Sequence, residues 1–86
     1  MYRVFYKKSA IKDLRKLSKT EELKIRRIIS DLEKNPRPNR CKKIKKYKDI
    51  YRIRTGNYRI IYSIVYDILT VEIFKIAQRK DVYKNL

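Results

Sequence analysis

The stretch Tyr51–Tyr62, with the sequence YRIRTGNYRIIY, constrains the fold of this chain more than any other. Two short runs of Tyr, Ile and Arg stand on either side of a Thr-Gly-Asn break. Gly and Asn adopt positive φ at low cost, and β-branched and aromatic residues suit a pleated strand, so the pattern predicts a β-hairpin. Alternation in the first strand places Arg52 and Arg54 on one face and Tyr51 and Ile53 on the other. The hairpin should therefore have one apolar face and one cationic face.

Two segments that precede the hairpin predict helices. Apolar residues recur three or four positions apart in residues 10–17 and again in residues 25–32, which is the spacing of one face of an amphipathic helix. Ser9 is a suitable N-cap for the first helix, and the S-x-x-E capping box that begins at Ser18 suits the second. Asn35-Pro36 should end the second helix, because proline disfavours α geometry in the residue before it.

Strands are predicted at residues 2–6, at the two arms of the hairpin and at residues 70–77, where β-branched and aromatic residues are frequent. In residues 58–66 every second residue is Tyr or Ile, which is more typical of packing against helices than of base stacking. Residues 36–49 are polar and predict a loop. The expected fold is α+β with the order β-α-α-β-β-β: one twisted, mainly antiparallel sheet with two N-terminal helices packed on one face, in a single domain over residues 1–86.

The charge of the chain indicates a polyanionic partner. There are 25 basic and 9 acidic side chains, which gives a net charge of +16, and such a field attracts nucleic acid over long range. Nine basic residues and one acid lie between Arg40 and Arg59, so the predicted loop runs directly into the cationic strand. A solvated loop without a specific role is the alternative for an isolated basic run. The residues expected to bind nucleic acid outside the hairpin are Arg40, Lys42, Lys43, Lys45, Lys46, Lys48, Lys75 and Lys80.

The side-chain inventory excludes several kinds of catalytic site. Histidine is absent, Cys41 is the only cysteine, and Gly56 is the only glycine, so neither a zinc cluster nor a Gly-rich phosphate loop is expected. The nine carboxylates are scattered and form no metal-binding or glycosidase spacing, and no cofactor is predicted. Arg, Lys and Tyr remain, which can bind phosphates, stabilise a developing phosphorane charge and shift a proton. The available chemistry is metal-free cleavage or plain binding of nucleic acid.

The compartment can also be predicted. The N-terminus lacks the apolar region of a signal peptide, and no window approaches the ~20 apolar residues of a membrane span. A single cysteine allows no intramolecular disulfide. We expect a soluble cytoplasmic protein with no membrane partner.

The order strand-helix-helix, the Y-R-I-R-x-G-N-Y-R-I-x-Y hairpin and the closing R-K-D-V-Y of residues 79–83 together resemble the RelE/ParE superfamily of toxins. The likeness spans nearly the whole chain. It implies the toxin of a type II toxin–antitoxin system, a ribosome-dependent endoribonuclease that cuts mRNA in the ribosomal A site and so inhibits translation. In the reaction that this resemblance implies, the ribose 2′-OH attacks the adjacent phosphate and leaves a 2′,3′-cyclic phosphate and a 5′-hydroxyl, without metal or cofactor. The implied partners are mRNA, the ribosome with its rRNA, and an acidic RelB-like antitoxin; the toxin is implied to be monomeric when free and a heteromer with the antitoxin.

The same resemblance implies five catalytic residues. Arg52 and Arg54 would position the scissile phosphate, and Arg59 would brace its non-bridging oxygens through its planar fork. Arg79 would stabilise or help protonate the leaving 5′-oxygen. Tyr83 would take or relay the 2′-OH proton. RelE itself has lysines at the positions of Arg52 and Arg54, and because arginine stays protonated, the difference moves the base role towards Tyr83.

Two alternatives of other classes remain open. ParE-like members share the fold and inhibit DNA gyrase by binding, without cleavage, and fold alone does not separate these functions. The set of Arg and Tyr residues favours the ribonuclease, since ParE-type toxins generally do not retain it in full. The third possibility is a basic nucleic-acid-binding module that does not cut.

Overall fold

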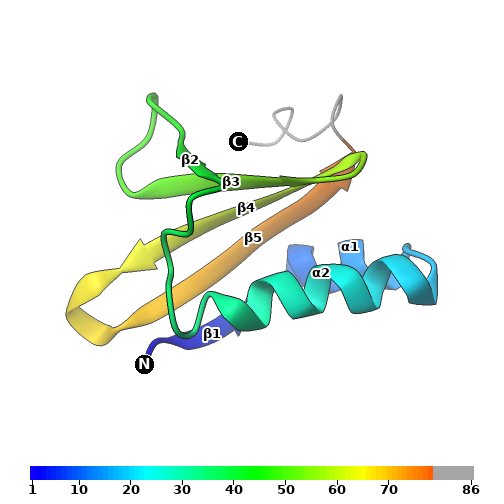
Figure 1. The fold of residues 1–86 in the computed structure, drawn as a ribbon, viewed down its shortest axis with the longest axis horizontal. Coiled ribbons are helices and arrows are strands. Elements are labelled where there is room, and N and C mark those ends of the chain that lie inside the picture. Colours follow the sequence, from blue (N-terminus) through cyan, green and yellow to red (C-terminus); the bar gives the residue numbers. More distant parts are fainter. Residues whose placement is uncertain (79–86) are drawn as a thin grey trace.

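The structure, a computed structural model, describes residues 1–78. Its elements are β1 (Arg3–Tyr6), α1 (Lys8–Arg15), α2 (Lys19–Asp31), β2 (Cys41–Lys43), β3 (Ile50–Thr55), β4 (Tyr58–Val65), the 3-10 turn η1 (Tyr66–Ile68) and β5 (Thr70–Gln78). The strands form one sheet in the order β1-β5-β4-β3-β2, in which only the β1–β5 pair is parallel. Both helices lie on the same side of this sheet (Figure 1). The predicted α+β class, with two helices on one face, is confirmed.

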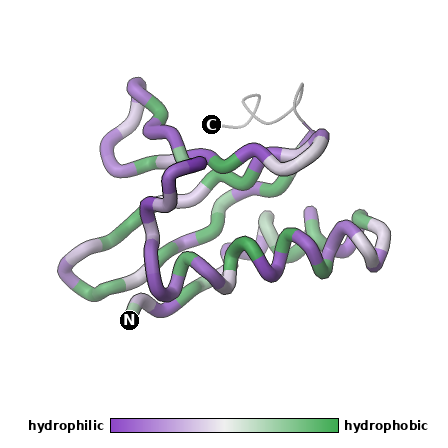
Figure 2. The backbone as a smooth tube through the Cα atoms, in the orientation of Figure 1, coloured by the Kyte–Doolittle hydropathy of each residue, from purple (hydrophilic) through white to green (hydrophobic). Residues whose placement is uncertain are grey.

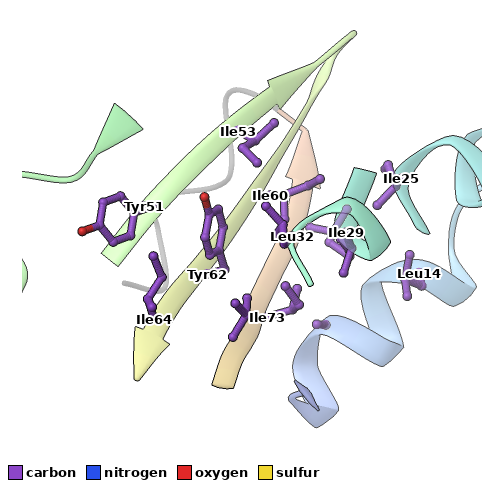
Figure 3. Close-up of a cluster of buried hydrophobic side chains, with 13 residues drawn as sticks. Leu14, Ile25, Ile29, Leu32, Tyr51, Ile53, Ile60, Tyr62, Ile64 and Ile73 are labelled. Atoms are coloured by element: carbon purple, nitrogen blue, oxygen red, sulfur yellow. The ribbon is translucent and has the colours of Figure 1, made fainter. Parts of the chain in front are cut away.

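The core lies between the helices and one face of the sheet. Alternation in the hairpin is confirmed, since Tyr51 and Ile53 of β3 and Ile60 and Tyr62 of β4 are all buried on the helix side. Figure 3 shows Ile60 beside α2, with Tyr62 and then Tyr51 farther from this helix, and burying each Ile stabilises the fold by roughly 1.5–3 kcal/mol. Gly56 supplies the positive φ of 59° that the hairpin turn requires. The cluster consists of Ala10, Leu14, Ile25, Ile29, Leu32, Tyr51, Ile53, Ile60, Tyr62, Ile64, Val71, Ile73 and Ile76.

The two predicted helix caps have different outcomes. The capping box is confirmed, because the Ser18 hydroxyl accepts a hydrogen bond from the Glu21 N–H at 3.2 Å. Ser9 is not a cap: α1 begins at Lys8 after Lys7, and the Ser9 hydroxyl donates to the carbonyl of Phe74 at 2.7 Å. The prediction was wrong because Ser9 contacts a strand that is distant in sequence.

That contact belongs to a seal along the free edge of β5. Beyond the end of β1, Asp13 Oδ2 accepts a hydrogen bond from the Ile76 N–H at 2.9 Å, and Ser9 contacts Phe74 as described. Ser9 and Asp13 are four residues apart and therefore lie on the same side of α1. Two side chains of α1 thus form hydrogen bonds with backbone groups of β5 that a neighbouring strand would otherwise pair with. This protects the edge of β5 from pairing with another chain.

The predicted loop at residues 36–49 contains a strand that the sequence analysis missed. Cys41–Lys43 form β2, the outer strand that pairs with Tyr51 to Ile53 of β3. The sequence of these residues does not predict a strand, because they are few and mostly polar. They form a strand because they pair with the exposed edge of β3. Residues 1–78 therefore contain one more strand than predicted.

The alternation of side chains along β5 changes after Ile73. Tyr62 pairs with Ile73 while Ile61 pairs with Lys75, so Phe74 is the extra residue of a β-bulge. The bulge moves Ile76 to the core side and turns Lys75 to the opposite face. The strand before it also ends earlier than predicted, at Val65, because Tyr66 begins η1 and is exposed. Among residues 1–78, no helix has the length and apolar character needed to cross a bilayer.

Candidate nucleic-acid interface

Three of the predicted site arginines share the face of the hairpin that points away from the helices. Arg54 is the cross-strand partner of Arg59, and Arg52 is the partner of Ile61. Because paired residues share a face, and their neighbours along each strand enter the core, these arginines project from the opposite side. Arg54 is exposed, Arg52 is half-buried and Arg59 is only 7% exposed. The structure brings together the three predicted catalytic residues that it describes.

The pairing of Arg54 with Arg59 brings two positive charges together on one face of the hairpin. Like charges directly opposite one another on neighbouring strands are destabilising, and a nearly buried guanidinium has lost most of its hydration. An anion placed between the two side chains would relieve the repulsion. Two planar guanidinium forks suit the non-bridging oxygens of a phosphodiester.

Arg40 extends this surface at the end of β2. Its Nη2 donates to the carbonyl of Arg54 at 2.9 Å, just beyond the pair formed by Cys41 and Ile53. The Arg40 side chain thereby forms a hydrogen bond with the edge of β3 beyond the point where β2 stops pairing with it. Arg40, predicted to bind RNA, thus also holds the backbone that carries Arg54.

The remaining predicted RNA-binding lysines fall into three places. Those of β2 and of the loop after it are exposed, in a loop that is mainly hydrophilic (Figure 2). Lys75 lies elsewhere: its ammonium group is 3.8 Å from Asp13 Oδ2 of α1. Arg79, Lys80 and Tyr83 lie outside the described residues. The exposed group consists of Lys42, Lys43, Lys45, Lys46 and Lys48.

Sequence reasoning missed an aromatic cluster on the other side of the sheet. The rings of Tyr51 and Tyr62 stack with their centroids 5.9 Å apart, and the guanidinium carbon of Arg37 lies 5.4 Å from the Tyr51 centroid. The Tyr51 and Tyr66 hydroxyls are 3.4 Å apart. The hydrogen bond with Tyr66, and then burial, raise the pKa of Tyr51 to about 12. The charges of Tyr51 and Tyr66 raise the pKa of Arg37 in turn, so this guanidinium is a permanent cation.

Arg37 has one signal in the sequence that could have identified it. The chain contains two prolines, and they are Pro36 and Pro38 on either side of this arginine. Within the described residues, no group of three or more His, Cys, Asp or Glu side chains gathers to hold a metal ion. The candidate interface instead offers guanidinium, ammonium and phenol groups, which bind phosphates and stack on bases.

Comparison with known proteins identifies the family. The family model described as the ParE toxin of the type II toxin–antitoxin system parDE matches residues 4–83. The chain belongs to the RelE/ParE family of type II toxins. RelE1 of Methanocaldococcus jannaschii is 35% identical over 81 residues, which cover 91% of this chain and 90% of the relative. RelE3 of the same organism is 33% identical over 85 residues and covers 94% of each chain.

Solved structures agree with this assignment of the RelE/ParE family. The structure of the archaeal RelE–RelB complex from Pyrococcus horikoshii contains a chain that matches with a TM-score of 0.81 and 31% identity, over 91% of this chain and 94% of that one. The predicted membership of a toxin family and the predicted RelE-like fold are both confirmed.

Proposed function

We propose that this RelE/ParE toxin is an endoribonuclease that cuts mRNA in the ribosomal A site. The observation that supports this most is the opposed pair Arg54 and Arg59, with Arg52 on the same face of the hairpin. Two guanidinium groups opposite each other suit the non-bridging oxygens of a phosphodiester. Since ribosomes are the proposed target, the proposed site of action is the cytoplasm.

In the proposed step the ribose 2′-oxygen forms a bond to the adjacent phosphorus as the bond from phosphorus to the 5′-oxygen breaks. The products are a 2′,3′-cyclic phosphate and a 5′-hydroxyl. Negative charge grows on the non-bridging oxygens in the transition state, and Arg59 would stabilise it from its nearly buried position. Arg52 and Arg54 would hold the phosphate in line.

The proposed cleavage also requires two proton transfers. The 2′-OH must lose a proton to a base and the 5′-oxygen must gain one. The side chains of Arg52 and Arg54 stay protonated, so neither serves as the base. From the family resemblance we assign the base to Tyr83, and we assign to Arg79 the role of stabilising or helping to protonate the leaving 5′-oxygen; both lie outside the described residues.

We also propose that the chain, monomeric when free, forms a heteromer with an acidic, RelB-like antitoxin. The solved relative from Pyrococcus horikoshii is a RelE–RelB complex. A net charge of +16 repels itself in a compact chain, and an acidic partner would neutralise it. A partner that binds only the folded chain stabilises it by mass action, so the complex should melt above the free chain.

The proposed ribonuclease activity is tested with purified protein and end-labelled mRNA, with and without programmed ribosomes. We expect cuts only with ribosomes, at the codon in the A site, with cyclic phosphate on the upstream fragment. Intact mRNA in both samples would refute the proposal.

A second candidate, inhibition of DNA gyrase, is favoured by one observation, the ParE description of the matching family model. The same protein preparation is added to gyrase and relaxed plasmid. Loss of supercoiling together with intact mRNA would support the gyrase inhibitor. Unchanged supercoiling together with cut mRNA would support the ribonuclease.

A further inference from the structure

Arg37 is an exposed side chain that the backbone holds unusually firmly. It lies between Pro36 and Pro38, and proline fixes its own φ and restricts the residue before it to extended geometry. The Arg37 N–H donates to Asn35 Oδ1 at 3.1 Å. The conformation of this short segment is therefore restricted on both sides of Arg37.

Two further hydrogen bonds fasten the prolines themselves. The carbonyl of Pro36 accepts from the Tyr62 hydroxyl at 2.7 Å, and the carbonyl of Pro38 accepts from the Cys41 N–H at 2.9 Å. Tyr62 is fully buried, so the first bond ties the segment to the core. Burial raises the pKa of Tyr62 far above its ordinary value, so its hydroxyl keeps the proton that it donates.

The Arg37 side chain is the outermost layer of a stack. Tyr62 lies innermost, Tyr51 stacks on it at 5.9 Å, and the Arg37 guanidinium lies over Tyr51 at 5.4 Å. Figure 3 shows the two rings side by side at the end of the core away from α1. Tyr51 is only 3% exposed, so a ligand that approaches this stack meets the guanidinium first.

An exposed arginine loses considerable rotamer freedom in such a position, and closing the connection between α2 and β2 does not require a guanidinium. A planar guanidinium is a good stacking surface for an unpaired base, and a ring behind it keeps it in place. Net charge and the adjacent basic residues of β2 and its loop favour RNA as the ligand. We propose that an unpaired RNA base stacks on the guanidinium of Arg37, on the face of the sheet opposite Arg52 and Arg54.

The identity of the ligand as RNA rests on the proposed function, but the test measures binding and needs no cleavage. The probe is a short 2′-O-methyl oligoadenylate, which lacks the attacking hydroxyl, at physiological ionic strength. Arg37→Ala should weaken binding roughly tenfold, as expected for the loss of one stacked base. Arg37→Lys should weaken it about as much, since it keeps the charge and loses the plane. Tyr66→Phe, which removes a hydroxyl beside the guanidinium, should have a smaller effect of about twofold.

The matched control is Arg27→Ala, which removes one charge from an exposed position on α2 and should change affinity less than about twofold. An abasic strand of equal length should bind wild type and Arg37→Ala equally. Wild-type affinity in Arg37→Lys, or equal losses in Arg37→Ala and Arg27→Ala, would overturn the stacking proposal. Failure of wild type to bind the oligoadenylate would overturn the stacking proposal alone, because the proposed ribonuclease acts on ribosomes. RNA binding without mRNA cleavage on programmed ribosomes would refute the ribonuclease alone.

Discussion

The two faces of the β3–β4 hairpin differ in what their side chains contribute. On the helix side, Tyr51, Ile53, Ile60 and Tyr62 are at most 3% exposed and stabilise the fold. On the other side the same strands place Arg54 opposite Arg59, so two like charges face each other. The difference teaches that apolar burial explains the first face, whereas the second places like charges together, for which we propose an anionic ligand.

The largest effect on stability is expected at the helix side. Ile60→Ala should lower the free energy of unfolding by about 2–5 kcal/mol, because Ile60 is fully buried and its truncation leaves a cavity. Chemical denaturation measures the loss. Ile68→Ala is the matched control, since Ile68 is 64% exposed and should change stability by less than about 0.5 kcal/mol. Equal effects of the two changes would contradict the assignment of the core.

The seal of the β5 edge should contribute less than the core. Asp13→Ala removes the acceptor for the Ile76 N–H and the partner of Lys75, so unfolding should become easier by about 1–3 kcal/mol. Asp13→Asn keeps an acceptor oxygen and should lose less. The exposed Asp31→Ala serves as the control in the same denaturation series. Wild-type stability in Asp13→Ala would show that the edge needs no seal.

The arginine face should respond in the opposite direction. Arg59→Met keeps the aliphatic stem and removes the charge that faces Arg54, so we expect stability to rise by about 0.2–1 kcal/mol. Arg52→Met should give no such gain, because Arg52 faces Ile61. Thermal melts of the three proteins measure this. A clear loss of stability in Arg59→Met would mean that this face also supports the fold.

The last effect on stability concerns pH. The pKa of Tyr51 is raised from its ordinary value of 10 to about 12, so the folded state holds this proton more tightly than the unfolded state. The resulting stability is fully present below pH 10 and is lost as the pH rises towards 12. Tyr51→Phe removes this dependence, so its stability should fall less than that of wild type over this range. Lysine titration affects both proteins equally and cancels in their difference. Parallel curves of stability against pH for wild type and Tyr51→Phe would refute the raised pKa of Tyr51.

Local pattern was sufficient to predict the hairpin, the capping box at Ser18 and the two-faced distribution of the arginines. Long-range contacts explain what it missed. Ser9 contacts β5 instead of capping its own helix, and β2 is a strand only because β3 offers an edge. The bulge at Phe74 could have been predicted from the sequence, because the spacing of the buried apolar residues changes from two (Val71 to Ile73) to three (Ile73 to Ile76).

The candidate site was predictable to a similar extent. Alternation placed Arg52 and Arg54 together, and strand pairing adds Arg59. Arg37 could not be found from periodicity because it lies outside any regular element, and its stacking partner Tyr51 is distant in sequence.

The central claim is that the arginine face acts on RNA while the helix face maintains the fold. The most direct measurement is the rate of mRNA cleavage on programmed ribosomes by Arg59→Met, relative to the amount of folded protein. The account predicts a rate lower than that of wild type by roughly 100- to 1,000-fold, as for loss of one transition-state donor, at undiminished stability. A wild-type cleavage rate in Arg59→Met would contradict it.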